Sequence, residues 1–162
     1  MAQIYLGLGS NIDPEENLGL GIRELRHRYG ALDISAVYKN AAVGFEGPDF
    51  LNLVVGCETA QSPLEVHEQI EIIHSMAGRK RGEEKFASRP LDIDLLLYDD
   101  QVIDLEPLRI PRSDVLEYAF VLRPLAELAP DLEHPLTGRT LSDHWADFDA
   151  ASQPLTPIAD IL

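Results

Sequence analysis

Apolar residues recur along this chain at two spacings, and each spacing predicts one type of element. Short runs that are apolar throughout, or that alternate with polar residues, are typical of strands. Four segments have one of these patterns: residues 3–8, 32–39, 50–58 and 91–98. The sequence therefore predicts four strands, the first of which ends at the turn signal Gly9-Ser10-Asn11.

Two segments between these strands carry apolar residues at every third or fourth position, as amphipathic helices do. The first helix is expected to begin at Pro14, with Asp13 as its N-cap, and to end at Gly30. The second is expected to begin in the capping box Ser62-Pro63-Leu64-Glu65 and to end at Gly78. The expected buried faces consist of Leu18, Ile22 and Leu25 in the first helix and of Val66, Ile70 and Ile73 in the second.

The order strand, helix, strand, strand, helix, strand is that of the ferredoxin-like fold. We therefore expect an α+β protein with a ferredoxin-like βαββαβ core, an antiparallel-rich sheet and helices on one face of that sheet. After this core we expect a turn at residues 99–102 leading into a short strand, and a short helix within residues 114–128. A C-terminal extension is expected to end in a wrapping tail of about 25 residues. The chain has no internal repeat, and 162 residues suit a single domain, 1–162.

The net charge of −15 restricts the classes of partner. A general nucleic-acid binder and a protein that binds anionic membranes both need a basic surface, so neither is expected. No apolar run approaches the roughly 20 residues that span a bilayer, and the N-terminus lacks the pattern of a signal peptide. We therefore expect a cytoplasmic protein, and a monomer. Its one cysteine, Cys57, excludes an internal disulfide and is expected to be buried and inert.

The basic residues are concentrated in one short segment. Five of the 13 lie between residues 79 and 89, where only two acidic residues oppose them. The five are Arg79, Lys80, Arg81, Lys85 and Arg89. A local positive segment in an acidic protein suggests a defined anionic ligand, although composition alone favours a solvated charged loop. Arginine suits phosphate, because its planar guanidinium binds two phosphate oxygens at once.

Two carboxylates follow this basic segment on the fourth predicted strand. Asp92 and Asp94 are two residues apart, so both point to one face, whereas Ile93, Leu95 and Leu97 are expected to point to the other, buried face. Adjacent carboxylates repel each other unless a cation lies between them, and Mg²⁺ prefers a few carboxylates completed by water and phosphate oxygens. The alternative is a solvated pair of aspartates. Together with the arginines upstream, the pattern favours a metal–phosphate site, which is what phosphoryl transfer requires.

Other motifs are less specific. Gly7-Leu8-Gly9-Ser10-Asn11 lacks the third glycine of a dinucleotide-binding loop, and the chain has no Walker A motif. Phe50 and Asn52 share a strand face and could hold a flat heterocycle, but the residues alone favour core packing of Phe50 and strand-edge exposure of Asn52. The histidines show no zinc-site spacing and are expected to be surface or capping residues: His27, His67, His74, His134 and His144.

Five short segments together carry a resemblance to a known family. They are Tyr-Leu-Gly-Leu-Gly-Ser-Asn (5–11), Phe-Leu-Asn (50–52), Gly-Arg-Lys-Arg (78–81), Arg-Pro-Leu-Asp-Ile-Asp-Leu-Leu (89–96) and Phe-Val-Leu-Arg-Pro-Leu-Ala-Glu-Leu-Ala-Pro (120–130). In this order and spacing the chain resembles the 6-hydroxymethyl-7,8-dihydropterin pyrophosphokinase family of the folate pathway. The resemblance extends over most of the chain, from about residue 3 to about residue 136.

The resemblance implies a ferredoxin-like core and an ATP-dependent pyrophosphokinase. The implied reaction transfers pyrophosphate from ATP to the hydroxymethyl group of the pterin and releases AMP. The resemblance also implies that Asp92 and Asp94 hold two Mg²⁺ ions, one of which orients the attacking hydroxyl. Asn52 would hydrogen-bond the pterin, and Phe50 and Phe120 would stack on its two faces.

Contacts to the phosphates of ATP are implied for three arginines. Arg79 and Arg81 would lie on a mobile loop that closes over the phosphates, and Arg89 would contact them from the scaffold. The loops 40–49 and 79–89 would act as lids that exclude water.

The chain departs from the family pattern around these residues. Lys85-Phe86-Ala87-Ser88 stands where the family has Arg-Trp-Gly-Pro, Arg112 where it has histidine, Tyr118 where it has arginine, and His74 where it has glutamate. Losing one aimed phosphate contact would cost about 2–4 kcal/mol of transition-state stabilisation. Two alternatives therefore stay open: a divergent paralogue that binds nucleotide or pterin without this activity, and an enzyme for a different pterin.

Overall fold

The structure is a computed structural model, and it describes residues 1–78, 88–159 and 162 of the chain. Within these residues the chain forms, in order, β1 (Ala2–Ser10), α1 (Pro14–Tyr29), β2 (Asp33–Ile34), β3 (Val37–Asn40), β4 (Phe50–Thr59), α2 (Pro63–Met76), β5 (Asp92–Tyr98), β6 (Ile103–Leu105), β7 (Leu108–Ile110), α3 (Asp114–Glu117), α4 (Ala119–Leu128), α5 (Leu141–Asp147), the 3₁₀ turn η1 (Ala150–Ser152) and β8 (Thr156–Ile158).

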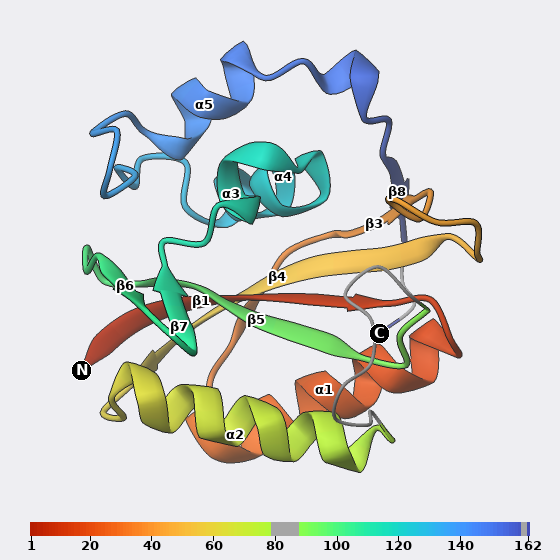
Figure 1. The fold of residues 1–162 in the computed structure, drawn as a ribbon, viewed down its shortest axis with the longest axis horizontal. Helices are drawn as coiled ribbons and strands as arrows, with labels where there is room; N and C mark the ends of the chain where they lie inside the picture. Colours follow the sequence, from red (N-terminus) through yellow and green to blue (C-terminus); the bar gives the residue numbers. More distant parts are fainter. Residues whose placement is uncertain (79–87, 160–161) are drawn as a thin grey trace.

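The main sheet has the order β5-β1-β4-β3-β8, with β2 also beside β4, and every neighbouring pair is antiparallel. The four predicted strands correspond to β1, to β2 with β3, to β4 and to β5. Helices α1 and α2 connect them as a split βαβ arrangement requires (Figure 1). The predicted α+β class and the ferredoxin-like βαββαβ core are therefore confirmed.

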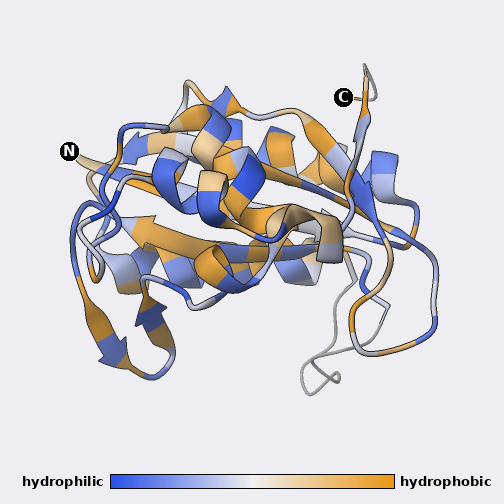
Figure 2. Cartoon of the chain, turned by 90° about the horizontal axis from the view of Figure 1, so that it is seen from above, coloured by the Kyte–Doolittle hydropathy of each residue, from blue (hydrophilic) through white to orange (hydrophobic). Residues whose placement is uncertain are grey.

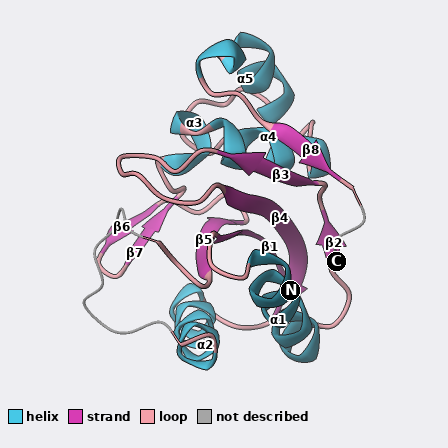
Figure 3. Cartoon of the chain, turned by 90° about the vertical axis from the view of Figure 1, so that its right-hand side faces the viewer, coloured by secondary structure: helices cyan, strands magenta, loops and turns pink. Residues whose placement is uncertain are grey.

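Helices α1 and α2 cover one face of this sheet, below it in Figure 1 and in the side view of Figure 3. The six apolar residues predicted for their inner faces are all buried, in one cluster with Leu6, Leu8 and Val55 of the sheet. The capping box at Ser62 is present as predicted, since its side chain accepts from Glu65 N and Glu65 accepts from Ser62 N. Among the described residues, no helix is long and apolar enough to cross a membrane.

The other face of the sheet is also covered, so the prediction of helices on one face only is wrong. Helix α4 packs there on β4 through Leu122 and Leu125, in a second apolar cluster with Val54 and Leu96. Figure 2 shows the central strands as mainly apolar, as a sheet buried on both faces must be. The helix predicted within residues 114–128 is in fact two, α3 and α4, because Tyr118 between them is extended.

A β-bulge in β5 changes one predicted orientation. The pairing of β5 with β1 shifts register next to Leu95, so that Leu6 pairs with Leu95 and Tyr5 with Leu97. Ile93 and Leu95 lie in the cluster between the sheet and helices α1 and α2, as predicted, but Leu97 packs in the cluster on the α4 side. The extra residue in a bulge reverses the alternation of faces beyond it, and alternation alone could not predict this.

Two local predictions are corrected. Residues 32–39 are not one strand, because Ser35 interrupts the pairing with β4: its hydroxyl, rather than a main-chain oxygen, accepts from Val54 N at 2.9 Å. Asp13 does precede α1, but it lies in the left-handed region (φ 42°) and its side chain makes no capping hydrogen bond. The Asn17 side chain, in the first turn of the helix, donates from Nδ2 to Ile12 O at 2.6 Å.

The C-terminal extension has more regular structure than the predicted wrapping tail. It contains α5, and β8 pairs with β3 and so adds a strand to the main sheet. Because an exposed strand edge can pair with other chains, this addition protects the edge that β3 would otherwise present.

Cys57 is buried in β4, as predicted. Burial raises the pKa of its thiol to about 11, with a smaller contribution from the charge of Asp33. With such a pKa only about 0.1% of the thiol is ionised at pH 8, and the thiolate is the reactive form. We expect 5,5′-dithiobis(2-nitrobenzoate) to leave the native protein unmodified at pH 8 and to titrate one thiol per chain in guanidinium chloride. Rapid modification of the native protein would contradict a buried Cys57.

Candidate active site

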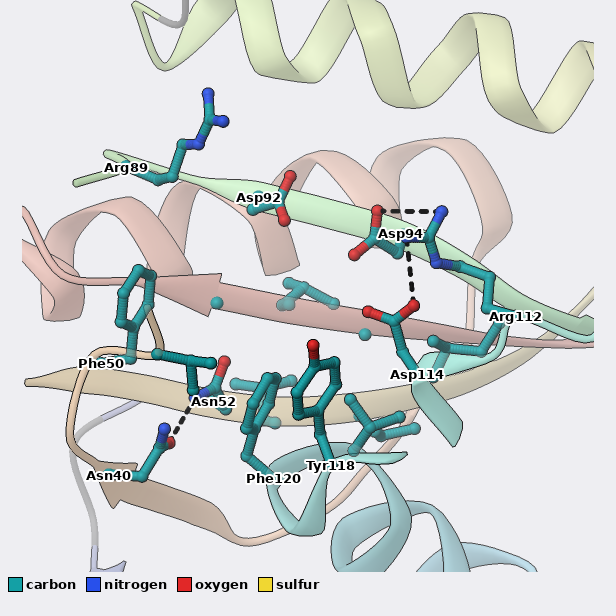
Figure 4. A pocket seen from close by; sticks show the side chains of 18 of the residues that line it. Asn40, Phe50, Asn52, Arg89, Asp92, Asp94, Arg112, Asp114, Tyr118 and Phe120 are labelled. Carbon is teal, nitrogen blue, oxygen red and sulfur yellow. Dashed lines mark hydrogen bonds and ion pairs between the residues drawn. The ribbon is translucent and has the colours of Figure 1, made fainter. Parts of the chain in front are cut away.

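The sheet face on the α4 side is hollowed by a cavity of about 420 Å³ (Figure 4). Its floor follows from strand alternation: Gly7 and Gly9 of the central strand β1 face it, with every second residue of the strands on either side. In the sheet register Gly9 lies opposite both Asn52 of β4 and Asp92 of β5. Because these two β1 positions carry no side chain, no side chain from them fills the floor of the cavity.

The glycine at position 9 also sets the position of an amide. A Cβ atom at Gly9 would lie 2.5 Å from Asn52 Oδ1, so no larger residue fits without moving the Asn52 side chain. Asn52 Nδ2 donates to Asn40 Oδ1 on the neighbouring strand β3 at 2.6 Å. Asn52 is 6% exposed and lies in a strand that is paired on both sides. The interpretation of Asn52 as an exposed strand-edge residue is therefore wrong.

Aromatic rings stand on both sides of this amide. Figure 4 shows Phe50 on one side of Asn52 and Phe120 on the other. Phe50 contacts the edge of Phe45 (centroids 6.3 Å apart), and Phe120 stacks on Tyr118 (5.1 Å, 19° between planes). Both rings line the cavity and stay partly exposed, so the preference for Phe50 as a core residue is wrong. Two rings beside a held amide are suited to a flat, hydrogen-bonding heterocycle.

The opposite end of the cavity is charged. Asp92 and Asp94 both line it from β5, which confirms their predicted common face. Arg112 lies beside them, with Nη1 3.8 Å from Asp94 Oδ1 and Nη2 3.3 Å from Asp114 Oδ1. Burial by itself would lower the pKa of the Arg112 guanidinium, but Asp94, Asp114 and Asp92 raise it on balance. Arginine at this position therefore stays charged.

These residues fit a magnesium ion that also binds phosphate. In the part of the chain that the structure describes, no three His, Cys, Asp or Glu side chains converge as a complete ligand set. Two carboxylates side by side are nevertheless what Mg²⁺ takes from a protein when phosphate oxygens and water supply its other ligands. Arg112 itself lines this end of the cavity, and its buried Nε has no hydrogen-bond partner among the described residues.

Of the three predicted phosphate-binding arginines, the structure describes one. Arg89 lines the cavity and is 4% exposed. Arg79 and Arg81 lie outside the described residues, as do Lys85 and Phe86.

Asn11 is a site residue that the sequence reasoning missed. It is buried, and its side chain joins the two segments that border the cavity: Nδ2 donates to Pro48 O and to Ser88 Oγ at 3.2 Å, and Oδ1 accepts from Arg89 N at 2.7 Å. The sequence signals were its place in the turn after β1, where an asparagine is ordinary, and its position at the end of the segment 5–11 that carries the family resemblance.

Replacing Asn11 should therefore loosen both borders of the cavity. We expect Asn11→Ala to raise KM about tenfold for each of the two substrates that the resemblance implies. It should also lower the free energy of unfolding by about 1–3 kcal/mol, since one buried and two partly buried hydrogen bonds lose their partner. Steady-state kinetics and chemical denaturation would measure these effects. Asn17→Ala, which removes one exposed hydrogen bond, is the control. Unchanged KM values in Asn11→Ala would show that the borders do not depend on it.

Two histidines do not fit the expectation of surface or capping residues. His74 and His134 are 4% and 2% exposed. Burial, and secondarily the charge of His144, lowers the pKa of His134, whose Nδ1 accepts from Leu136 N. His74 Nε2 accepts from Ile93 N at 2.8 Å, and Ile93 lies between Asp92 and Asp94 in the chain.

Comparison with known proteins identifies the family. Residues 5–130 match the family described as 7,8-dihydro-6-hydroxymethylpterin-pyrophosphokinase (HPPK). The chain belongs to the HPPK family. It is therefore a pyrophosphokinase that uses ATP as co-substrate, and the predicted family is confirmed.

Related sequences agree with this assignment. The chain is 36% identical over 145 residues to 2-amino-4-hydroxy-6-hydroxymethyldihydropteridine pyrophosphokinase of Aquifex aeolicus, covering 88% of this chain and 90% of that protein. It is 34% identical over 139 residues to the protein of the same name in Haemophilus influenzae, covering 83% and 86%.

Solved structures of HPPK proteins share the fold. A crystal structure of Plasmodium falciparum HPPK-DHPS with pterin and p-hydroxybenzoate matches with a TM-score of 0.74 over 93% of this chain, at 15% identity. This HPPK chain spans 43% of the length of that protein. At this identity the match concerns the fold alone.

Proposed function

We propose that this HPPK chain transfers pyrophosphate from ATP to the hydroxymethyl group of 6-hydroxymethyl-7,8-dihydropterin, a step of folate biosynthesis. The hydroxyl oxygen attacks the β-phosphorus of ATP, and the bond from that phosphorus to the oxygen bridging the α-phosphorus breaks. AMP leaves, and the hydroxyl proton passes to solvent. One observation carries the proposal: a single cavity combines an aromatic and amide end with a carboxylate and arginine end, in a chain of this family.

The aromatic end would bind the pterin. Asn52 is held by Asn40, so its oxygen is directed rather than free to rotate, and it can accept from the edge of a flat ring. Phe50 and Phe120 would stack on the two faces of that ring. A ring held in this way presents its substituent to the charged end, which places the hydroxymethyl group toward the phosphates.

The charged end would bind the phosphates with two Mg²⁺ ions on Asp92 and Asp94. When bound, Mg²⁺ neutralises phosphate charge and orients the reacting oxygens. Arg89 and Arg112 would add donors to the same phosphates, and we include Arg79 and Arg81 in this proposal on the strength of the family motif alone. By the same family pattern, the loops 40–49 and 79–89 would keep water from the transferred group.

A second candidate is a paralogue that binds nucleotide or pterin without transferring pyrophosphate, or that acts on a different pterin. Two observations favour it: Tyr118, where the family has arginine, stacks on Phe120, and Arg112 is paired with Asp94 and Asp114. The tyrosine removes one cation from the phosphate end, and the two carboxylates compete with phosphate for the Arg112 guanidinium. We further propose that the chain acts as one domain, as a monomer and in the cytoplasm.

An AMP assay separates these functions. The purified protein is incubated with Mg-ATP and 6-hydroxymethyl-7,8-dihydropterin, and AMP and the pterin diphosphate are quantified by chromatography. We expect stoichiometric amounts of both products. ATP binding by calorimetry without AMP formation would refute the transferase and support the binding paralogue, and AMP formed only with another pterin would show a changed substrate.

A further inference from the structure

Strand β5, which carries both carboxylates, is the last strand on its side of the sheet. On such an edge strand every second N–H points away from the sheet and needs a partner from elsewhere. For Ile93 that partner is a side chain: Ile93 N donates to His74 Nε2 at 2.8 Å. His74 comes from the last turn of α2 and is 4% exposed. The hydrogen bond therefore joins the edge strand to the helix beside it.

This hydrogen bond determines which nitrogen of the His74 imidazole carries the proton. A ring nitrogen that accepts from a backbone N–H carries no proton, so the proton is on Nδ1. Nδ1 lies 3.3 Å from Glu71 Oε1, one helical turn earlier, and can donate to it. His74 is thus a neutral acceptor, and the Glu71 carboxylate orients its ring through Nδ1.

The hydrogen bond lies next to both carboxylates along the chain. Ile93 stands between Asp92 and Asp94, so the N–H that His74 accepts from is adjacent to the backbone atoms that direct both aspartate side chains. His74 Nε2 is also 4.0 Å from Asp92 Oδ1. A neutral acceptor satisfies the N–H without adding a third negative charge beside the two aspartates, which an anionic acceptor would do.

We propose that His74 is a positioning residue for the reaction, which holds the Ile93 backbone so that Asp92 and Asp94 stay aimed at the cavity. This inference rests on the proposed function of the carboxylates. His74 does not contact substrate in it; the imidazole acts through the main chain of β5. Misplacing groups that bind a transferred phosphate by about 1 Å can cost about a hundredfold in rate, so one hydrogen bond at this point can matter.

The test uses the reach of two amide side chains. A glutamine amide reaches the position of Nε2 in a histidine, whereas an asparagine amide reaches only that of Nδ1. His74→Gln can therefore accept from Ile93 N, but His74→Asn and His74→Leu cannot. His27→Leu, the same replacement at an exposed position of α1, is the matched control. The measurements are the hydrogen-exchange rate of the Ile93 amide by NMR without substrates, and kcat and KM for AMP formation.

We expect His74→Leu and His74→Asn each to raise the exchange rate of the Ile93 amide and to lower kcat, by about tenfold or more. KM for the pterin should change less than about twofold, since β4 and α4 form the pterin end. His74→Gln and His27→Leu should stay within about threefold of wild type in both readouts. If His74→Leu does not fold, the comparison of asparagine with glutamine decides alone.

Wild-type kcat in both His74→Leu and His74→Asn, or equal loss in the asparagine and glutamine variants, would overturn the positioning role. A wild-type protein that forms no AMP would instead refute the proposed function. In that case an unchanged Ile93 exchange rate in His74→Asn would still overturn the structural half of the inference.

Discussion

Asp92→Asn and Asp94→Asn are each expected to lower the rate of AMP formation by at least about a hundredfold while the fold stays intact. Asparagine has nearly the shape of aspartate but no charge, so a Mg²⁺ ion loses one of its few protein ligands and the phosphates lose a counter-ion. The loss should appear in kcat, because the interaction is strongest when charge moves between the phosphate oxygens.

Stability should respond differently from activity in these variants. Two like charges on one strand face repel each other, and Arg112 keeps Asp114 as a partner when Asp94 is neutralised. Neither change is therefore expected to destabilise the protein, and Tm should stay within about 3 °C of wild type. Asp147→Asn, at an exposed carboxylate that pairs with Arg139, is the control and should change neither kcat nor Tm appreciably. A wild-type rate in either Asp92→Asn or Asp94→Asn would refute the metal assignment of that residue.

Gly9→Ala is expected to weaken pterin binding by about a hundredfold. The new Cβ would lie 2.5 Å from Asn52 Oδ1, closer than two such atoms can approach, and both belong to paired central strands. The amide must therefore turn away, which breaks its bond to Asn40 and leaves the pterin edge without its partner. A site built to hydrogen-bond its ligand loses about a hundredfold or more when that bond cannot form.

The measurement is the Kd of the pterin and of Mg-ATP by calorimetry. The pterin Kd should rise by about a hundredfold, whereas Mg-ATP, which uses the other end of the cavity, should bind with a Kd within about threefold of wild type. Gly19→Ala is the matched control, because a Cβ there meets only the end of the flexible Arg23 side chain at 3.8 Å. In helix α1 this change should raise the free energy of unfolding by about 0.5–1 kcal/mol. Wild-type pterin binding in Gly9→Ala would contradict the proposed role of Asn52.

Much of the fold could be predicted because its signals are local. Strand and helix periods, the Ser62 capping box and the glycine at position 30 are all properties of a few neighbouring residues. Their order along the chain then restricts the topology to very few arrangements. The predictions that were wrong concern elements whose form depends on a distant partner in the chain. The bulge at Leu96 depends on β1, the break at Ser35 on β4, and the strand β8 on β3.

Of the candidate site, too, the sequence predicts the local features and misses those that depend on distant residues. That Asp92 and Asp94 face one side follows from strand period alone, and the arginine cluster before them suggested a phosphate ligand from the sequence, a prediction that stays open. The family resemblance then named the reaction. Asn52, by contrast, looked exposed in the sequence, because nothing in Phe-Leu-Asn says that β4 is a central strand.

By itself, then, the sequence determined the ferredoxin-like order of elements, the common face of the two aspartates and the family. These depend on residue types and on spacing along one chain, which are local. Only the tertiary structure decided that Gly9 makes room for the Asn52 amide, that Asn11 joins the two borders of the cavity, and that His74 holds the strand between the aspartates. Each of these needs residues from different elements within a few ångströms, and such distances are set by packing and register rather than by sequence order.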